Sequence, residues 1–154
     1  MIACKENRRD VVDLLLRLHS DVNHCDKDNC SPLAFACNTW NFDLVDLLLT
    51  YGADINLADK DMISPLHIAC MNDNKKLVLK LVENKANVNA EDKIGQTPLF
   101  KSVFNGYNEI VDILLRHGAS IDICDKSGCS SLAIAGIKGH NTIVDLLTQY
   151  SQNK

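Results

Sequence analysis

The chain has 154 residues, a length that suits one domain, and a formal net charge of −4. Because affinity for nucleic acid rests on neutralising phosphates, this mildly acidic balance argues against a nucleic-acid partner. The apolar runs are too short to insert into a membrane, and the N-terminus lacks the apolar stretch of a signal peptide. The seven cysteines have no disulfide-scaffold spacing, so we expect reduced thiols. Reduced thiols are typical of a protein in the cytoplasm or the nucleus.

Two blocks of sequence recur along the chain with a period of 33 residues. The first block contains all three prolines, and it reads DKDNCSPLAFAC from Asp26, DKDMISPLHIAC from Asp59, DKIGQTPLFKSV from Asp92 and DKSGCSSLAIAG from Asp125. The second block reads VVDLLLRLHSDVN from Val11, LVDLLLTYGADIN from Leu44, LVLKLVENKANVN from Leu77 and IVDILLRHGASID from Ile110. Such a period predicts a solenoid of stacked units.

Each copy predicts a turn followed by two helices. A Ser or Thr offers the oxygen that caps a helix N-terminus, and a proline follows at the first helical position, where its missing N–H does no harm. The second block carries apolar residues at helical spacing, and the stretch after it is rich in Asp and Asn, as turns are. We expect a single domain over 1–154, with a partial repeat over 1–25 and repeats over 26–58, 59–91, 92–124 and 125–154.

The stretch SPLHIA over 64–69 resembles the ankyrin repeat signature T-P-L-H-x-A, and the period is also that of the ankyrin repeat family. The resemblance covers essentially the whole chain. It implies an all-α ankyrin repeat solenoid of about four and a half repeats. It further implies a protein–protein interaction module that binds a partner protein through its concave face, with no catalysis and no cofactor; we expect a monomer.

The copies also differ from one another. Trp40 and Asp73 replace a glycine between the two helices, and Lys85 replaces a glycine that closes the second helix. Lys101 occupies a slot that is apolar in other repeats, so we expect looser packing there. The first repeat lacks its hairpin and most of its first helix. This favours an alternative in which the chain is a targeting or regulatory segment of a larger enzyme, adaptor or channel.

His67 and Cys70 share one helical face, as a catalytic base and thiol would. Other repeats fill these slots with residues such as Ala34 and Val103, so packing sets them, and the resemblance implies a structural histidine. Two cysteine pairs, Cys25 with Cys30 and Cys124 with Cys129, flank turns that lie three repeats apart. They cannot share one metal ion, and we expect no metal site; redox or adventitious metal binding is the lesser alternative.

The candidate partner-binding residues are mainly apolar. Three consecutive first helices place Met71, Phe104 and Ile137 in one slot, and Ile63 and Ile94 lie on the adjacent hairpins. They predict an apolar strip of the kind that marks a partner site. That these side chains instead complete the core is an equally open interpretation. Trp40, at a turn between helices, is a separate candidate hot spot.

Two polar series run along the repeats. Lys27, Lys60, Lys93 and Lys126 follow the turn aspartates and could meet an acidic partner. We favour a solvated edge in which the neighbouring aspartate offsets each charge. The resemblance further implies candidate sites for an asparaginyl hydroxylase at Asn23, Asn56 and Asn89, in the sequences DVN, DIN and NVN.

Overall fold

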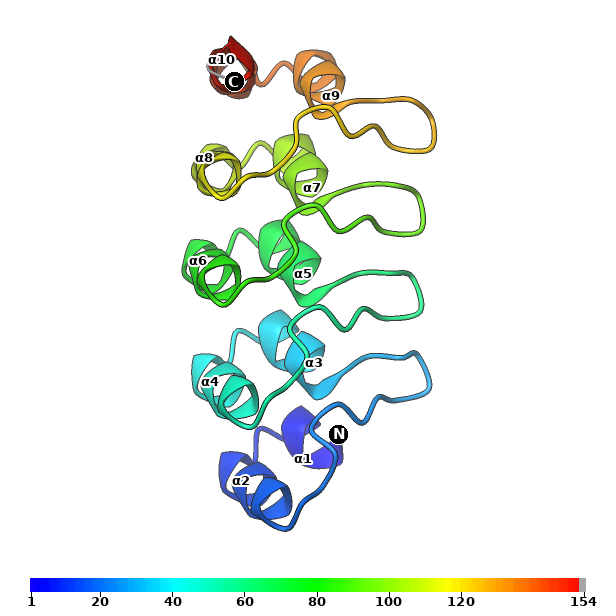
Figure 1. Ribbon diagram of the computed structural model, residues 1–154, viewed down its shortest axis with the longest axis vertical. Coiled ribbons are helices and arrows are strands. Elements are labelled where there is room, and N and C mark those ends of the chain that lie inside the picture. Colours follow the sequence, from blue (N-terminus) through cyan, green and yellow to red (C-terminus); the bar gives the residue numbers. More distant parts are fainter. Residues whose placement is uncertain (153–154) are drawn as a thin grey trace.

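A computed structural model describes residues 1–152, which form one continuous stack of helix pairs (Figure 1). The helices of this part are α1 (Ile2–Lys5), α2 (Arg9–Arg17), α3 (Pro32–Asn38), α4 (Phe42–Thr50), α5 (Pro65–Met71), α6 (Lys75–Glu83), α7 (Pro98–Asn105), α8 (Asn108–Arg116), α9 (Ser131–Lys138) and α10 (Asn141–Gln152). Over 1–152 no strand occurs, although Cys124 and Ser130 form an isolated antiparallel bridge. The predicted all-α solenoid is therefore confirmed.

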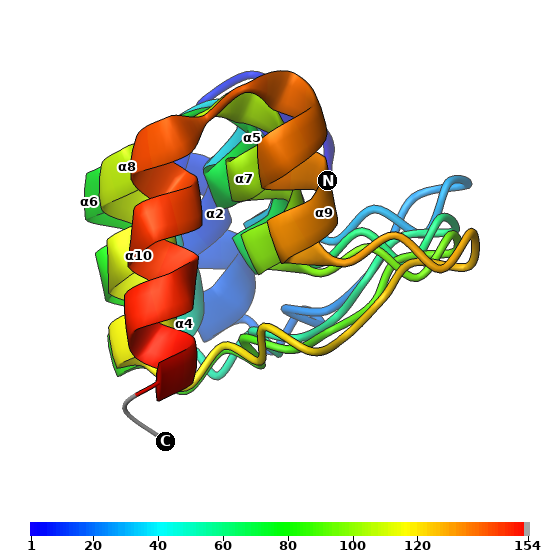
Figure 2. The same ribbon diagram turned by 90° about the horizontal axis from the view of Figure 1, so that it is seen from above.

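The helices form two layers, and the loops project from one of them. Figure 2 shows the even-numbered helices on one side, the odd-numbered helices beside them, and the loops extending beyond the odd-numbered ones. We call α3, α5, α7 and α9 the inner helices and the even-numbered ones the outer helices. The hairpin turns cover 26–30, 59–63, 92–96 and 125–129. Inner helices and hairpin turns together form what we call the groove face.

Each inner helix begins as the repeat pattern predicts. The side-chain oxygens of Ser31, Thr97 and Ser130 accept hydrogen bonds from the backbone N–H three residues on, at 3.0, 3.2 and 3.1 Å. These caps satisfy donors that have no partner inside the helix. Prolines follow in three repeats, and the fourth has Ser131 there. Its hydroxyl is buried and bonds to no other atom of the described residues.

An aspartate shapes each hairpin turn. Asp59 Oδ1 accepts the backbone N–H groups of Asp61 and Ile63 at 2.8 and 2.9 Å. Asp26, Asp92 and Asp125 make the equivalent pair of bonds in their own turns. A carboxylate that accepts backbone donors in this way holds the chain in a tight turn. The prediction that these aspartates lie in turns is confirmed.

The turns between paired helices need a left-handed residue. Gly106 has φ +79° there, and a Cβ added to it would lie 2.8 Å from the ring of His140. Trp40 and Asp73 adopt the same region, with φ of +58° and +51°. Because a Cβ atom disfavours this conformation by about 1–2 kcal/mol, both residues are held there by the surrounding structure.

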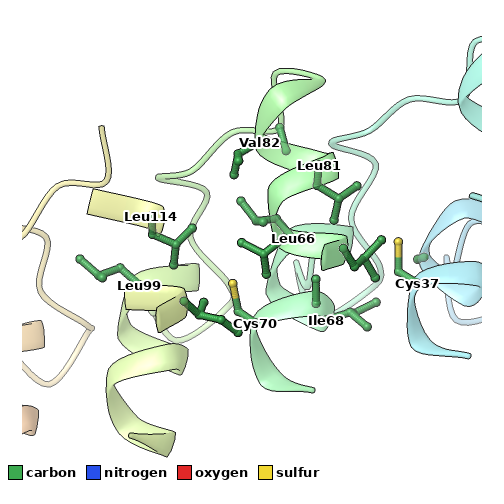
Figure 3. Packing of buried hydrophobic residues seen from close by; sticks show 14 of the residues in the cluster. Cys37, Leu66, Ile68, Cys70, Leu81, Val82, Leu99 and Leu114 are labelled. Atoms are coloured by element: carbon green, nitrogen blue, oxygen red, sulfur yellow. The ribbon is translucent and has the colours of Figure 1, made fainter. Parts of the chain in front are cut away.

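The core runs the length of the stack and is built of equivalent aliphatic side chains. Leu33, Leu66 and Leu99 occupy one slot of three successive inner helices, and all are buried. Figure 3 shows Leu66 on α5 and Leu99 on α7 among the buried side chains of the core. In the last repeat the same slot holds Leu132, which is 41% exposed against 0% for Leu99. The leucine in this slot is therefore covered by the next repeat along the stack.

Candidate partner-binding surface

His67 is a structural residue. Its Nδ1 accepts the backbone N–H of Ser64 at 3.2 Å and lies 2.8 Å from the Ser64 hydroxyl. Its Nε2 lies 3.0 Å from the carbonyl oxygen of Gln96 in the next hairpin. Because a carbonyl only accepts, the ring carries its proton on Nε2 and links two repeats. Burial lowers the pKa of His67, so the ring is neutral.

The buried cysteines are poor nucleophiles. Cys70 is fully buried between α5 and α7 (Figure 3), and both nitrogens of His67 are already bonded within the fold. Burial raises the pKa of Cys37 and Cys70 to about 12, which keeps both thiols protonated. All seven cysteines are free. The described residues contain no cluster of three or more groups suited to hold a metal ion.

The predicted apolar strip lies on the groove face. Met71, Phe104 and Ile137 lie in the last turns of three successive inner helices and are 38%, 44% and 75% exposed. Met71 and Phe104 line one open hollow together with Gln96, Lys101 and Asn105. A purely structural role would bury these side chains, as it buries the leucines of the core. Their exposure favours the interpretation of the strip as a binding surface.

The two hairpin isoleucines differ in exposure. Ile94 is 53% exposed at its turn, whereas Ile63 is half-buried and packs against the core. Both line a second hollow, between the hairpin turns at 59–63 and 92–96. Ile94 is therefore the more available of the two for contact with a partner.

A cation adjoins the strip at its C-terminal end. The amino group of Lys138 lies 3.9 Å from the centroid of the Phe104 ring, a geometry in which the ring face attracts a positive charge. The two residues are far apart in sequence and belong to α7 and α9. The repeat register aligns their helices, but this contact could not be predicted from the sequence.

Two of the four hairpin lysines, Lys60 and Lys93, form ion pairs, and each pairs with an aspartate of the preceding hairpin. Lys60 Nζ lies 2.9 Å from Asp28 Oδ1, and Lys93 Nζ lies 3.2 Å from Asp61 Oδ1. The ion pairs thus differ from the expected offset of each lysine's charge by the adjacent turn aspartate. The physical reason is that Asp59 and its equivalents accept backbone donors within their own turns.

Lys101 fills its apolar slot by forming an ion pair. Its Nζ lies 2.7 Å from Asp92 Oδ2 and also donates to Gln96 Oε1 at 2.7 Å. Burial alone would raise the pKa of Asp92. Lys101 and the N–H groups of Gln96 and Ile94 lower this pKa by more than burial raises it, so it falls below its usual range. The flanking residues Phe100 and Ser102 are buried. The expectation of looser packing here was wrong.

Trp40 stands apart from the strip. It is exposed at the turn between α3 and α4 and lines an open hollow with Asn7, Phe42 and Lys76. The amino group of Lys76 lies 4.7 Å from the centroid of the Phe42 ring beside it. The predicted hot spot is thus accessible, but it lies at the edge formed by the inter-helix turns.

The three candidate asparagines link successive loops. Asn23, Asn56 and Asn89 each accept, through Oδ1, a backbone N–H of the following repeat, at 2.9, 2.8 and 2.8 Å. These bonds satisfy loop N–H groups that regular secondary structure does not reach. The asparagines therefore have a structural role, whatever modification they receive.

A family model for ankyrin repeats, of three copies, matches residues 1–92 and again residues 66–154. The matches together span the chain, which therefore belongs to the ankyrin repeat family. Proteins of this family are generally protein–protein interaction modules and typically lack catalysis. A search of curated proteins finds no match. None of the helices within residues 1–152 is both long and apolar enough to cross a bilayer.

Proposed function

We propose that the chain binds another protein through its groove face, without catalysing a reaction. The observation that carries the proposal is the repeated exposure of Met71, Phe104 and Ile137 at one slot of three adjacent inner helices. Leaving bulky apolar side chains in water forgoes about 1.5–3 kcal/mol each relative to burying them. A partner that covers them recovers part of this free energy.

The groove is formed by rigid elements, which supports the same proposal. Inner helices hold the strip, and capped helix ends and Asp-closed turns hold the hairpins. A surface that is already in its binding conformation loses little conformational entropy on association. Methionine and phenylalanine suit such a surface, because one adapts its shape and the other offers a large area to desolvate.

The test compares groove variants with an outer-helix variant. A partner is isolated on the immobilised chain, identified by mass spectrometry, and purified, and its dissociation constant is then measured by titration calorimetry. Phe104→Ala or Met71→Lys should each weaken binding by more than about 1 kcal/mol, the level of a moderate hot spot. Unchanged affinity in both variants would move the site away from this face.

The residue changed in the control variant must lie outside the groove and form no side-chain hydrogen bond or ion pair in the described part of the chain. Asp112 on α8 suits this poorly, because it pairs with Arg116 at 2.7 Å and accepts a hydrogen bond from Tyr150 at 3.3 Å. Glu83, exposed at the end of the outer helix α6, is the better choice. Glu83→Ala should leave both affinity and helical circular dichroism unchanged.

We also propose a monomer in the cytoplasm or nucleus, where reducing conditions suit seven free cysteines. In the alternative role, as a regulatory or targeting segment of a larger enzyme, adaptor or channel, the same groove would bind a substrate or another part of that assembly. The proposed residues and the test are the same for both roles.

A further inference from the structure

The ion pairs between the lysine of one hairpin and the aspartate of the preceding hairpin form a series that we call the ladder, and each such position is a rung. At one rung the aspartate is missing. Asp28 and Asp61 hold the same position in successive hairpins, and each pairs with the lysine of the next hairpin. In the third hairpin of this series the position is Ile94. Lys126 still donates its backbone N–H to the Ile94 carbonyl at 2.9 Å, as Lys60 and Lys93 do to Asp28 and Asp61. Its amino group forms no ion pair with any described residue.

The single difference at residue 94 therefore has two effects at one place. It exposes an isoleucine on the groove face and leaves the adjacent lysine without a carboxylate. The last inner helix adds Lys138, which lies against the Phe104 ring and likewise pairs with no carboxylate in residues 1–152. Two unpaired cations thus flank the exposed apolar residues Ile94 and Phe104.

The hairpin carboxylates nearby are already engaged. Asp92 is buried against Lys101, and Asp61 pairs with Lys93. Asp125 accepts two backbone N–H groups and the Ser127 hydroxyl, which lies at 2.6 Å. They leave Lys126 and Lys138 free to meet a negative charge from outside.

Resting on the function proposed above, we infer that the C-terminal half of the groove binds a protein segment in which acidic residues adjoin bulky apolar ones. The apolar side chains cover Phe104 and Ile94, and the carboxylates meet Lys126 and Lys138. Opposite charges at the rim of an apolar contact favour the correct partner and its register. The hairpin turns at 59–63 and 92–96 lack an unpaired lysine, because Lys60 and Lys93 pair with Asp28 and Asp61.

The probe is a phage-displayed library of random linear peptides selected on the whole chain. We expect the enriched peptides to combine Asp or Glu with Leu, Ile, Phe or Trp. A synthetic peptide of the enriched sequence is then compared with its Asn or Gln analogue. The acidic peptide should bind about threefold to fivefold more tightly, the effect of one partly exposed ion pair, and the advantage should shrink in high salt.

The variants use the ladder itself as a control. Lys126→Ser should remove the preference for the acidic peptide, whereas Lys60→Ser, at a rung already paired with Asp28, should keep it. Ile94→Asp restores the rung by placing a carboxylate beside Lys126, and it should weaken acidic-peptide binding most. This variant should fold, because two other hairpins carry Asp at that position.

The possible outcomes separate the two proposals. Failure to enrich acidic peptides, or a preference for them that survives both Lys126→Ser and Ile94→Asp, would overturn the inference. If Phe104→Ala still weakens binding of the selected peptides, the groove remains the binding surface and only its acidic preference is lost. If Phe104→Ala has no effect either, the proposed function fails as well.

Discussion

Truncating one leucine in two repeats tests how the stack is stabilised. Leu99 and Leu132 occupy the same slot of α7 and α9, but their exposed fractions are 0% and 41%. Replacing a fully buried leucine by alanine removes about three carbon groups, worth about 0.8 kcal/mol each, and leaves a cavity. We therefore expect Leu99→Ala to lower the free energy of unfolding by about 3 kcal/mol.

The same arithmetic gives a smaller loss for Leu132→Ala. Only part of that side chain is buried, and the open side leaves no closed cavity, so we expect about 1–1.5 kcal/mol. Urea unfolding followed by helical circular dichroism measures both values. Equal losses, or a loss at Leu99 below about 0.5 kcal/mol, as for ordinary surface changes, would refute the account of repeat-on-repeat burial.

Three further predictions concern His67, Ser131 and the loop asparagines. Because burial lowers the pKa of His67, the unfolded chain binds a proton that the folded chain resists, and stability should fall as the pH drops below about 6.5. Urea midpoints measured on both sides of this pH should fall less for His67→Gln than for the wild type; an equal fall would contradict the assignment. Ser131→Pro should raise the free energy of unfolding by about 0.5–1 kcal/mol, because it restricts the unfolded chain and removes a buried hydroxyl without a partner in the described residues. Ser130 already has the extended backbone that precedes proline. A lower urea midpoint would refute this prediction. Mass spectrometry after co-expression with an asparaginyl hydroxylase should find an added oxygen on Asn23, Asn56 or Asn89, and its absence from all three would reject the modification.

Features set by local chemistry were predictable from the sequence. A cap such as Ser64 and a turn residue such as Asp59 depend on neighbours a few positions away. The repeat register also indicated which slots face the groove, and Met71 and Phe104 are exposed there. The same register set Ile94 against Asp61, a difference whose effect on Lys126 became clear only with the pairing in the structure.

Specific contacts between side chains were harder to predict. The Lys101 slot holds apolar residues elsewhere, and only the fold brings its amino group to the buried carboxylate of Asp92. The stacking of Lys138 on Phe104 likewise depends on rotamers across two helices. The pairing of the lysines was partly predictable from the sequence, because an aspartate that closes its own turn can accept fewer bonds from a neighbouring lysine.

A photo-crosslinking amino acid placed at single positions tests the claim of groove binding most directly. One chain carries the crosslinker at residue 104 in the groove, and the other carries it at residue 83 on the outer helix α6. After irradiation with the identified partner, we expect a crosslinked product from position 104 and none from position 83. A crosslink from position 83 with none from position 104 would place the partner on the opposite face and contradict the account.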